Sequence, residues 1–413
     1  MVFFTTKKDF SISQDFNQIN LNFQSVQNDI NTNNIYLSSI LEIEKIGEMQ
    51  KDILSIIDEN KISHFITSKE LGASYKGQLN QIVSNSDKMF ESSFVDLDTQ
   101  IKNTNKKSIS IAFIGCFGGG IGDLISSIPA LRIFVDILKN KFEDINIDIY
   151  AHQFISSIYK NTKFFFEKED YIRDIFTLPI SIDKLNKYDF YVDTIFFMQD
   201  RKSLCMPIVD LSLYKLGIDC EKIENKLLNI SLQEDIFSLV KKYVQQKAQD
   251  KMVILFHPKS STALRSIPDE ISCLMLNTLL GDENIFVISV NDINFFKHDR
   301  FLDASALSLS LEHFFSFIGS VDFCISSDTS VYHIAGNLNI PSVVFFTSIE
   351  PHLRIKYYKN IYPIYLENKD IKNIHNEVRI SKDINLGNIF DNFDIVEFTD
   401  IINKVKKQIK HKQ

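Results

Sequence analysis

The chain has 413 residues, of which 44% are hydrophobic and 24% charged, and these values predict a globular protein of two or three domains. The net charge of −8 argues against a general nucleic-acid binder, which usually carries a basic excess. The five cysteines are scattered and form no Cys-x-x-Cys pair, which disfavours a zinc site and a disulfide framework. No apolar run approaches the roughly 20 residues that span a bilayer, and the first residues lack the order of a signal peptide. We therefore expect a soluble, cytoplasmic protein that could still contact the inner face of the membrane.

The first 105 residues are rich in Asn, Gln, Ser and Lys. Apolar residues recur at helical spacing between Ile35 and Ile46, and again between Ile53 and Ile57. This pattern predicts a mostly helical N-terminal region, ended by the polar stretch 102–107 as a linker. Such helices could make the protein a homo-oligomer or recruit an acceptor protein.

The pattern of apolar residues changes after the linker, and residues 106–230 form the next predicted domain. Ser108–Gly115 is a short apolar run that meets a glycine loop, which is typical of a buried parallel strand. A helical pattern follows from Ile121 to Leu138, and Pro129 inside it predicts a kink. Further strands are predicted at 145–151, 171–178 and 188–197, and a further helix near 153–166.

A second β/α series occupies residues 231–400. Strands are predicted at 252–256, 284–290, 323–325 and 342–346, and helices at 233–248, 269–280, 311–318 and from about 329. A basic helical tail, 401–413, follows. Alternating strands and helices indicate parallel sheets with helices on both faces. The fold class is therefore α/β, with two Rossmann-like domains after the N-terminal region.

The first candidate motif is the glycine loop that follows the first buried strand, Gly118, Gly119, Gly120 and Gly122 before Asp123. Glycines allow a sharp turn and a close approach of a ligand to the backbone. A dinucleotide fingerprint starting at Gly118 would need glycine at Asp123, and a P-loop starting at Gly115 would need lysine at Ile121. The loop therefore matches neither of these two phosphate-binding motifs. A plain strand–helix turn remains the alternative.

Asp123 lies in the first turn of the predicted helix, where the helix dipole favours a carboxylate. A carboxylate there suits a general base that accepts a proton from an attacking hydroxyl group. The alternative is a helix N-cap, a common role of aspartate.

Two more motifs follow strands of the second half, where ligands of open α/β sheets bind. The loop 257–268 offers Lys259, Ser260 and Arg265, a set that suits diphosphate oxygens. The segment 326–333 opens a helix and offers Asp328, Thr329, Ser330 and His333 at its N-terminal end. The alternatives are a solvated polar loop, capping residues and a structural histidine.

Together the three segments resemble glycosyltransferase family 9, the bacterial heptosyltransferases of lipopolysaccharide synthesis. The matching stretches are Gly122-Asp123 followed by Pro129-Ala130-Leu131, His257-Pro258 followed by Arg265 and Ile267-Pro268, and Asp328-Thr329 followed by His333-Ile334-Ala335. Pro341 and Glu350-Pro351 match the later strand and turn of the family. The similarity covers roughly residues 108–400.

The resemblance implies a GT-B fold, in which two Rossmann-like domains face a cleft, and an inverting mechanism without a catalytic metal or other cofactor. It implies that Asp123 is the base, and that the residues around Arg265 and Asp328–His333 hold the diphosphate of ADP-heptose or a related nucleotide sugar. The expected acceptor is a lipopolysaccharide-type or other surface glycan. A protein heptosyltransferase of the autotransporter-modifying type is the alternative. Since Ser330 replaces a glycine of the family, a non-catalytic sugar-nucleotide-binding protein is an alternative of another class.

Overall fold

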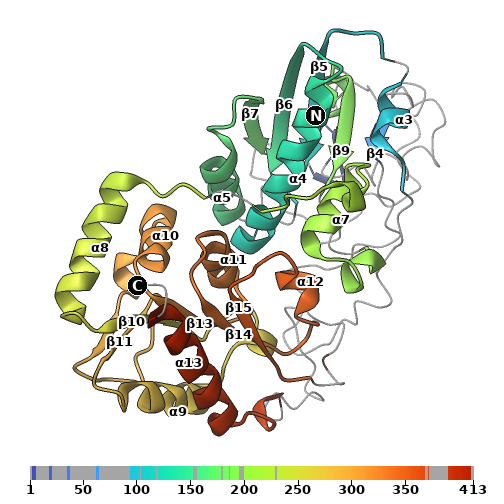
Figure 1. Ribbon diagram of the computed structural model, residues 1–413. Helices are drawn as coiled ribbons and strands as arrows, with labels where there is room; N and C mark the ends of the chain where they lie inside the picture. Colours follow the sequence, from blue (N-terminus) through green and yellow to red (C-terminus); the bar gives the residue numbers. More distant parts are fainter. Residues whose placement is uncertain are drawn as a thin grey trace. The chain divides into compact units, whose positions relative to one another are not determined.

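The structure is a computed structural model that describes residues 2–5, 18–20, 35–37, 62–64, 94–102, 104–117, 120–151, 156–177, 180–185, 187–194, 200–227, 230–367, 371 and 389–410. The described residues form two compact units, one up to Lys226 and one from Leu227 onward (Figure 1). This division lies close to the predicted domain boundary at 230. We describe each unit by itself.

A five-stranded, all-parallel sheet in the order β4-β9-β5-β6-β7 forms the centre of the N-terminal unit. Its strands are β4 (Ile62–His64), β5 (Ser108–Ile114), β6 (Asp144–Ala151), β7 (Ile172–Thr177) and β9 (Phe190–Asp193). The helices are α3 (Leu97–Ile101), α4 (Ile121–Lys139), α5 (Ser156–Phe166), α6 (Ile182–Leu185) and α7 (Ile208–Lys215), with 3-10 turns η5 (Arg201–Leu204) and η6 (Cys220–Lys222).

The central strand β5 is apolar on the face that α4 covers. Phe113 on this face meets Phe134 of α4 edge-on, with 6.0 Å between the ring centroids. The chain is helical from Ile121 to Lys139 with Pro129 inside α4, and the kink at Pro129 stays a prediction. The opposite face of β5 and β6 carries Ser110 and Asp148, whose contacts are described below.

A second, four-stranded sheet has the order β2-β1-β3-β8, with β1 at Val2–Thr5, β2 at Gln18–Asn20, β3 at Ile35–Leu37 and β8 at Ile180–Ser181. The predicted helical character of residues 1–105 is therefore wrong where the structure describes them, except in α3. Ile35–Leu37 is a strand because it pairs with β8, about 145 residues later in the chain by the register Tyr36↔Ser181. Short apolar runs fit both periods, and such long-range pairing decides between them.

The C-terminal unit is built on a six-stranded parallel sheet in the order β12-β11-β10-β13-β14-β15. Its strands are β10 (Met252–His257), β11 (Ile285–Ser289), β12 (Phe301–Asp303), β13 (Phe323–Ser327), β14 (Ser342–Phe346) and β15 (Ile361–Tyr365). Its helices are α8 (Glu234–Ala248), α9 (Asp269–Leu280), α10 (Leu311–Gly319), α11 (Ser330–Asn337), α12 (His352–Ile355) and α13 (Ile395–Lys410), with 3-10 turns η7 (Ala263–Arg265) and η8 (Ser305–Leu307). This strand order is that of a doubly wound, dinucleotide-binding-type sheet, in which ligands bind beyond the carboxyl ends of the strands.

Helices cover both faces of this sheet (Figure 1). α9 and α13 pack on one face, where Ile254, Met275 and Phe398 belong to one buried cluster. α13 starts at Ile395 and contributes Ile402, Val405 and Ile409 to that core, so residues 401–410 are the end of a packed helix.

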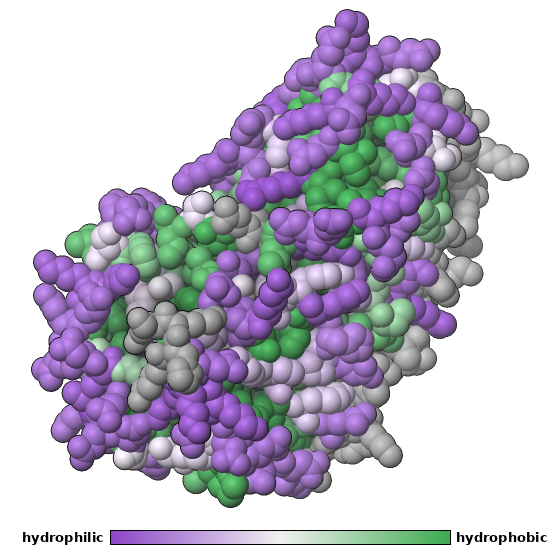
Figure 2. Space-filling model, in the orientation of Figure 1, coloured by the Kyte–Doolittle hydropathy of each residue, from purple (hydrophilic) through white to green (hydrophobic). Residues whose placement is uncertain are grey.

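Among the described residues, no helix is long and apolar enough to cross a membrane. Hydrophilic residues cover most of the surface that each unit shows in Figure 2, with apolar patches between them.

Candidate functional site

The turn after β5 in the N-terminal unit contains two residues with positive φ angles, Gly115 at 94° and Phe117 at 51°. A left-handed conformation is unusual for phenylalanine and must be held by its surroundings. The N–H of Phe117 donates to Oγ1 of Thr194 at 3.1 Å, and its buried ring lies 5.6 Å from that of Phe113. Thr194, directly after β9, also donates to the carbonyl of Ile114. Two neighbouring strands thus fix the start of the glycine loop.

Gly118 and Gly119 of the predicted active-site loop lie outside the described residues. Gly120 is the N-cap of α4 and has no side chain to offer as a cap. The alternative role of Asp123 as the N-cap is therefore wrong, because Asp123 is the third residue of the helix. A Cβ atom on Gly120 would lie 3.1 Å from Oδ2 of Asp123, so the carboxylate folds back over this glycine.

Asp123 is half-buried in the first turn of α4, where the helix dipole stabilises negative charge. Gly122 lies inside the same turn, and its carbonyl accepts a hydrogen bond from Ser126 at 2.9 Å. The structure thus places a carboxylate at the carboxyl edge of the N-terminal sheet, as the sequence predicts. Its role as the base remains a prediction.

Buried polar pairs hold α4 and α7 in place. Ser127 of α4 bonds to Ser212 of α7 at 3.1 Å between the two hydroxyl oxygens. Lys215 of α7 pairs with Asp200, and both side chains are fully buried. Lys226 pairs with Asp210 of α7 at 2.7 Å, with side chains 5% and 2% exposed. Such pairs are costly to break once buried, so α7 is a firm support for α4.

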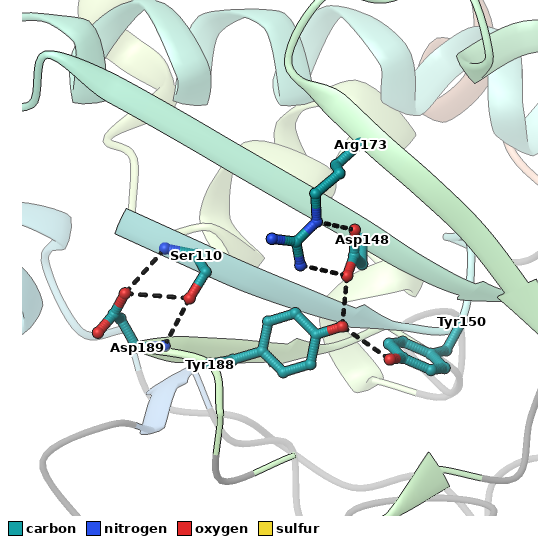
Figure 3. Close-up of polar contacts among 6 residues, drawn as sticks. All are labelled: Ser110, Asp148, Tyr150, Arg173, Tyr188 and Asp189. Carbon is teal, nitrogen blue, oxygen red and sulfur yellow. Dashed lines mark hydrogen bonds and ion pairs between the residues drawn. The ribbon is translucent and has the colours of Figure 1, made fainter. Parts of the chain in front are cut away.

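A second polar cluster lies on the opposite face of the same sheet, around Asp148 of β6 (Figure 3). Arg173 of β7 donates to both carboxylate oxygens of Asp148, at 3.0 and 2.5 Å. The hydroxyl of Tyr188 donates to the same carboxylate and lies 2.7 Å from that of Tyr150. Burial raises the pKa of Tyr150 to about 12. The groups satisfy one another, so we interpret the cluster as structural.

At the other edge of this face, Asp189 binds Ser110 of β5 (Figure 3). Its carboxylate accepts hydrogen bonds from the N–H and the hydroxyl of Ser110, at 2.9 and 3.0 Å. Lys106 also contacts this carboxylate. Burial opposes the charge of Asp189, but the bonds from Lys106 and Ser110 outweigh it and lower the pKa.

In the C-terminal unit, the two predicted ligand loops are joined directly. β10 and β13 are neighbours, so their carboxyl ends lie side by side, with His257 opposite Ser326. Ser260 of the first loop donates its hydroxyl to the backbone carbonyl of Asp328 in the second, at 3.0 Å. The structure therefore brings Ser260 and Asp328 together, as expected for strand ends of one sheet.

Both cations of the first loop have partners within the unit. Lys259 pairs with Asp269 at the start of α9. Arg265 donates to Oγ1 of Thr262 at 3.2 Å and to the hydroxyl of Ser261 at 2.5 Å. These two hydrogen bonds of Arg265 are to neutral hydroxyl groups of its own turn.

Several buried polar groups gather around the N-terminus of α11. Thr329 is the N-cap and accepts from the N–H of Val331 at 3.2 Å, and Ser330 is the first helical residue. Asp328 is 3% exposed, and its charge acts on the nearby hydroxyl of Tyr332. Among the described residues, Nδ1 of His257 and the hydroxyls of Ser326 and Ser327 have no hydrogen-bond partner although they are buried. Buried polar groups are nearly always bonded, so these atoms point to a missing ligand or water.

His333 is buried in the unit, as Asp328 is. Its Nδ1 lies 3.0 Å from the hydroxyl of Tyr358, and the residue is 4% exposed. Burial lowers its pKa to about 3, so the ring is neutral at pH 7. Gly336 makes room for Tyr358, because a Cβ there would lie 2.7 Å from the tyrosine ring. The structure gives His333 a contact that supports α11, and its role in donor binding stays a prediction.

The sequence analysis missed Thr194, Tyr332 and Arg354. Thr194 follows a strand that neighbours β5, and Arg354 follows the strand that neighbours β13. The rule that ligands meet strand ends would have pointed to both, had the strand order been known. Among the described residues, no group of three or more His, Cys, Asp or Glu side chains could hold a metal ion.

No family model matches the sequence, and no curated protein matches it either. Solved structures do match the fold. The ADP-heptose lps heptosyltransferase II of E. coli matches with a TM-score of 0.50 and 12% identity, over 73% of this chain and 99% of that one. The iron-containing dodecameric glycosyltransferase TibC from enterotoxigenic E. coli matches with a TM-score of 0.50 and 13% identity, over 74% and 77%. The chain therefore has the α/β fold of the heptosyltransferases, and the predicted GT-B fold class is confirmed.

Proposed function

We propose that this chain is an inverting glycosyltransferase that moves a heptose from ADP-heptose, or a related nucleotide sugar, to a hydroxyl group of a surface glycan. The observation that carries the proposal is the N-terminus of α11. In a heptosyltransferase fold, this helix starts beside buried groups without protein partners, Nδ1 of His257 and the hydroxyl of Ser327. A helix N-terminus at a strand edge is a ready binding site for phosphate.

The C-terminal unit would bind the donor. The N–H groups and the dipole of the first turn of α11 favour the negative charge of a diphosphate. Ser330 is the first residue of this turn, and Arg265 adds a cation from the neighbouring loop. Lys259 of the same loop is a second cation. As the sugar leaves, negative charge grows on the diphosphate oxygen, and fixed donors of this kind stabilise it. We propose that these groups take the part that a metal ion plays in other transferases.

The N-terminal unit would bind the acceptor. Its hydroxyl oxygen attacks the anomeric carbon of the donor sugar while the bond from that carbon to the diphosphate oxygen breaks. The hydroxyl proton passes to the carboxylate of Asp123, and the nucleoside diphosphate leaves with the bonding electron pair. One displacement from the opposite side inverts the anomeric configuration.

The base assignment is tested with Asp123→Asn and Asp123→Ala in the full chain, using ADP-heptose and a lipopolysaccharide core acceptor. Loss of a general base slows transfer by about 10²- to 10⁴-fold. ADP should still bind, since Asp123 belongs to the other unit. Asp136→Asn removes an exposed carboxylate of the same helix and should leave the rate unchanged. Near-normal transfer by a folded Asp123→Ala protein would refute the assignment.

The acceptor class is tested by mass spectrometry of surface glycans and surface proteins from cells with and without this protein. A heptose missing from the glycan supports the proposal, and one missing from a protein supports the protein-modifying alternative. Donor binding without turnover on any acceptor would instead identify a sugar-nucleotide-binding protein. Transfer that persists in excess EDTA supports metal-independent chemistry.

A further inference from the structure

Arg354 in α12 is a buried cation with few hydrogen-bond partners among the described residues. The residue is 7% exposed. Among the described residues, its guanidinium makes one hydrogen bond, a long one of 3.4 Å from Nη1 to the carbonyl of Leu353 next to it. Arg300 shows what a structural arginine of the same unit looks like. Its guanidinium reaches three backbone carbonyls, at 2.5 to 3.0 Å.

A buried charge is retained when a partner offsets the cost of removing it from water. No carboxylate of the described residues lies within ion-pair distance of Arg354. The five donors of its planar fork therefore have few acceptors among the described residues, and they suit two oxygens of one phosphate group. An anionic ligand would supply the missing partner.

The position of Arg354 near the N-terminus of α11 indicates which kind of anion it would bind. Its neighbour Leu353 packs in one buried cluster with Tyr332 of α11 and Phe346 of β14. β14 pairs with β13, so α12 and α11 both follow adjacent strand ends. The charge of Arg354 also acts on Tyr332 and His333, which belong to the first turn of α11. Three observations thus place the guanidinium beside the N-terminal turn of α11.

We propose that Arg354 binds a phosphate group of the nucleoside diphosphate, together with the N-terminus of α11. This inference rests on the proposed function and adds a residue that the three sequence motifs do not contain. A guanidinium fork beside a helix N-terminus distinguishes a diphosphate from a monophosphate, because the second phosphate supplies the oxygens that the fork binds. Arg354 would thus set the preference for a nucleoside diphosphate.

The test is calorimetric titration of the full chain with ADP, AMP and adenosine. Arg354→Gln should weaken ADP binding by about 10- to 100-fold, AMP binding less, and adenosine binding not at all. Arg354→Lys keeps the positive charge but lacks the guanidinium fork. Its ADP affinity should therefore lie between those of Arg354→Gln and the unaltered chain. Lys359→Gln removes an exposed cation of the same segment and should bind all three ligands as the unaltered chain does.

Melting temperatures separate a binding role from a structural one. If Arg354→Gln does not fold, Arg354→Lys carries the test, and its loss must again be larger for ADP than for AMP. Equal losses for ADP, AMP and adenosine would show a structural arginine and overturn the inference. Unchanged ADP affinity in a folded variant would also overturn it and leave the proposed function standing. An unaltered chain that binds none of ADP, UDP and GDP would overturn both.

Discussion

The buried polar groups of two regions of the molecule differ in whether they have partners. In the N-terminal unit, Asp148 and Lys215 are buried in direct contact with Arg173 and Asp200. At the carboxyl edge of the C-terminal sheet, buried groups such as Nδ1 of His257 have no partner among the described residues. A paired polar group holds the fold together, whereas an unpaired one at a strand edge costs stability until a ligand binds it. The comparison therefore associates rigidity with the first set of residues, and it supports the proposal that the second set binds a ligand.

The largest effect is expected from breaking a fully buried pair. Lys215→Met leaves the carboxylate of Asp200 buried without its cation, which should cost about 3–5 kcal/mol of unfolding free energy. The double variant Asp200→Leu with Lys215→Met should recover part of this loss, because no lone charge remains. Urea unfolding of the full chain measures both. Lys222→Met, whose side chain is 80% exposed, is the control. Equal midpoints for Lys215→Met and the unaltered chain would contradict the structural role.

The next effect is a loss of stability in mild acid. Burial lowers the pKa of His257 and of His333 to about 3, against about 6.5 in an unfolded chain. Below pH 6.5 the unfolded chain therefore binds protons that the folded chain does not. The stability contribution is complete above pH 6.5 and falls by about 1.4 kcal/mol per histidine for each pH unit below it, down to about pH 3.

Unfolding of the C-terminal unit between pH 7 and pH 5 measures this slope. The double variant His257→Gln with His333→Gln should flatten it, although its stability at pH 7 is lower. His298→Gln removes an exposed histidine and should leave the slope intact. A slope that survives in the double variant would mean that other groups cause the acid sensitivity.

A smaller effect is expected at the tyrosine that joins Asp148 to Tyr150. Tyr188→Phe removes a hydroxyl that contacts both groups and should cost about 1–3 kcal/mol, since the bond to Asp148 is charge-assisted. Tyr159→Phe removes one neutral bond, to the carbonyl of Ile175, and should cost less. Thermal unfolding ranks the two variants, and the reverse order would show that the cluster adds little to the fold.

The smallest stability effect is expected from two buried hydroxyl groups, those of Thr194 and Ser327. They test the comparison of paired with unpaired polar groups most directly. Thr194→Val leaves the N–H of Phe117 without its acceptor and should cost about 1–3 kcal/mol. Ser327→Ala removes a buried hydroxyl that has no partner among the described residues, so stability should not fall and should rise by about 1 kcal/mol. ADP affinity should nevertheless fall by about tenfold in Ser327→Ala. Similar stability losses in both variants would remove the distinction between paired and unpaired groups.

Four of the six strands of the C-terminal sheet were predicted from the sequence, and β12 and β15 were not. The helix Asp269–Leu280 and the strand Ser342–Phe346 have the predicted bounds, because buried apolar runs and clear end signals mark them. The sequence pattern did not predict α7, because two of its charged residues, Asp210 and Lys215, are buried in ion pairs. An inward-facing charge hides the apolar face on which the prediction of a helix depends.

The candidate site, too, could be predicted only in part from the sequence. The adjacency of Ser260 and Asp328 follows from the rule that parallel strand ends share one edge. Thr194 and Arg354 lie at strand ends too, but their importance depends on which strands are neighbours. That order is set by packing between distant segments, and no local pattern of the sequence reports it.

The packing of α13 has a consequence for the synthesis of the protein. Phe398 and Val405 belong to the same core as Ile254, some 150 residues earlier in the chain by their numbers. A growing chain that has just finished β15 therefore exposes the apolar face that α13 will cover. The C-terminal unit can close its core only after residues 395–410 have left the ribosome. Until then, that exposed face is a site where chaperones or other nascent chains can bind.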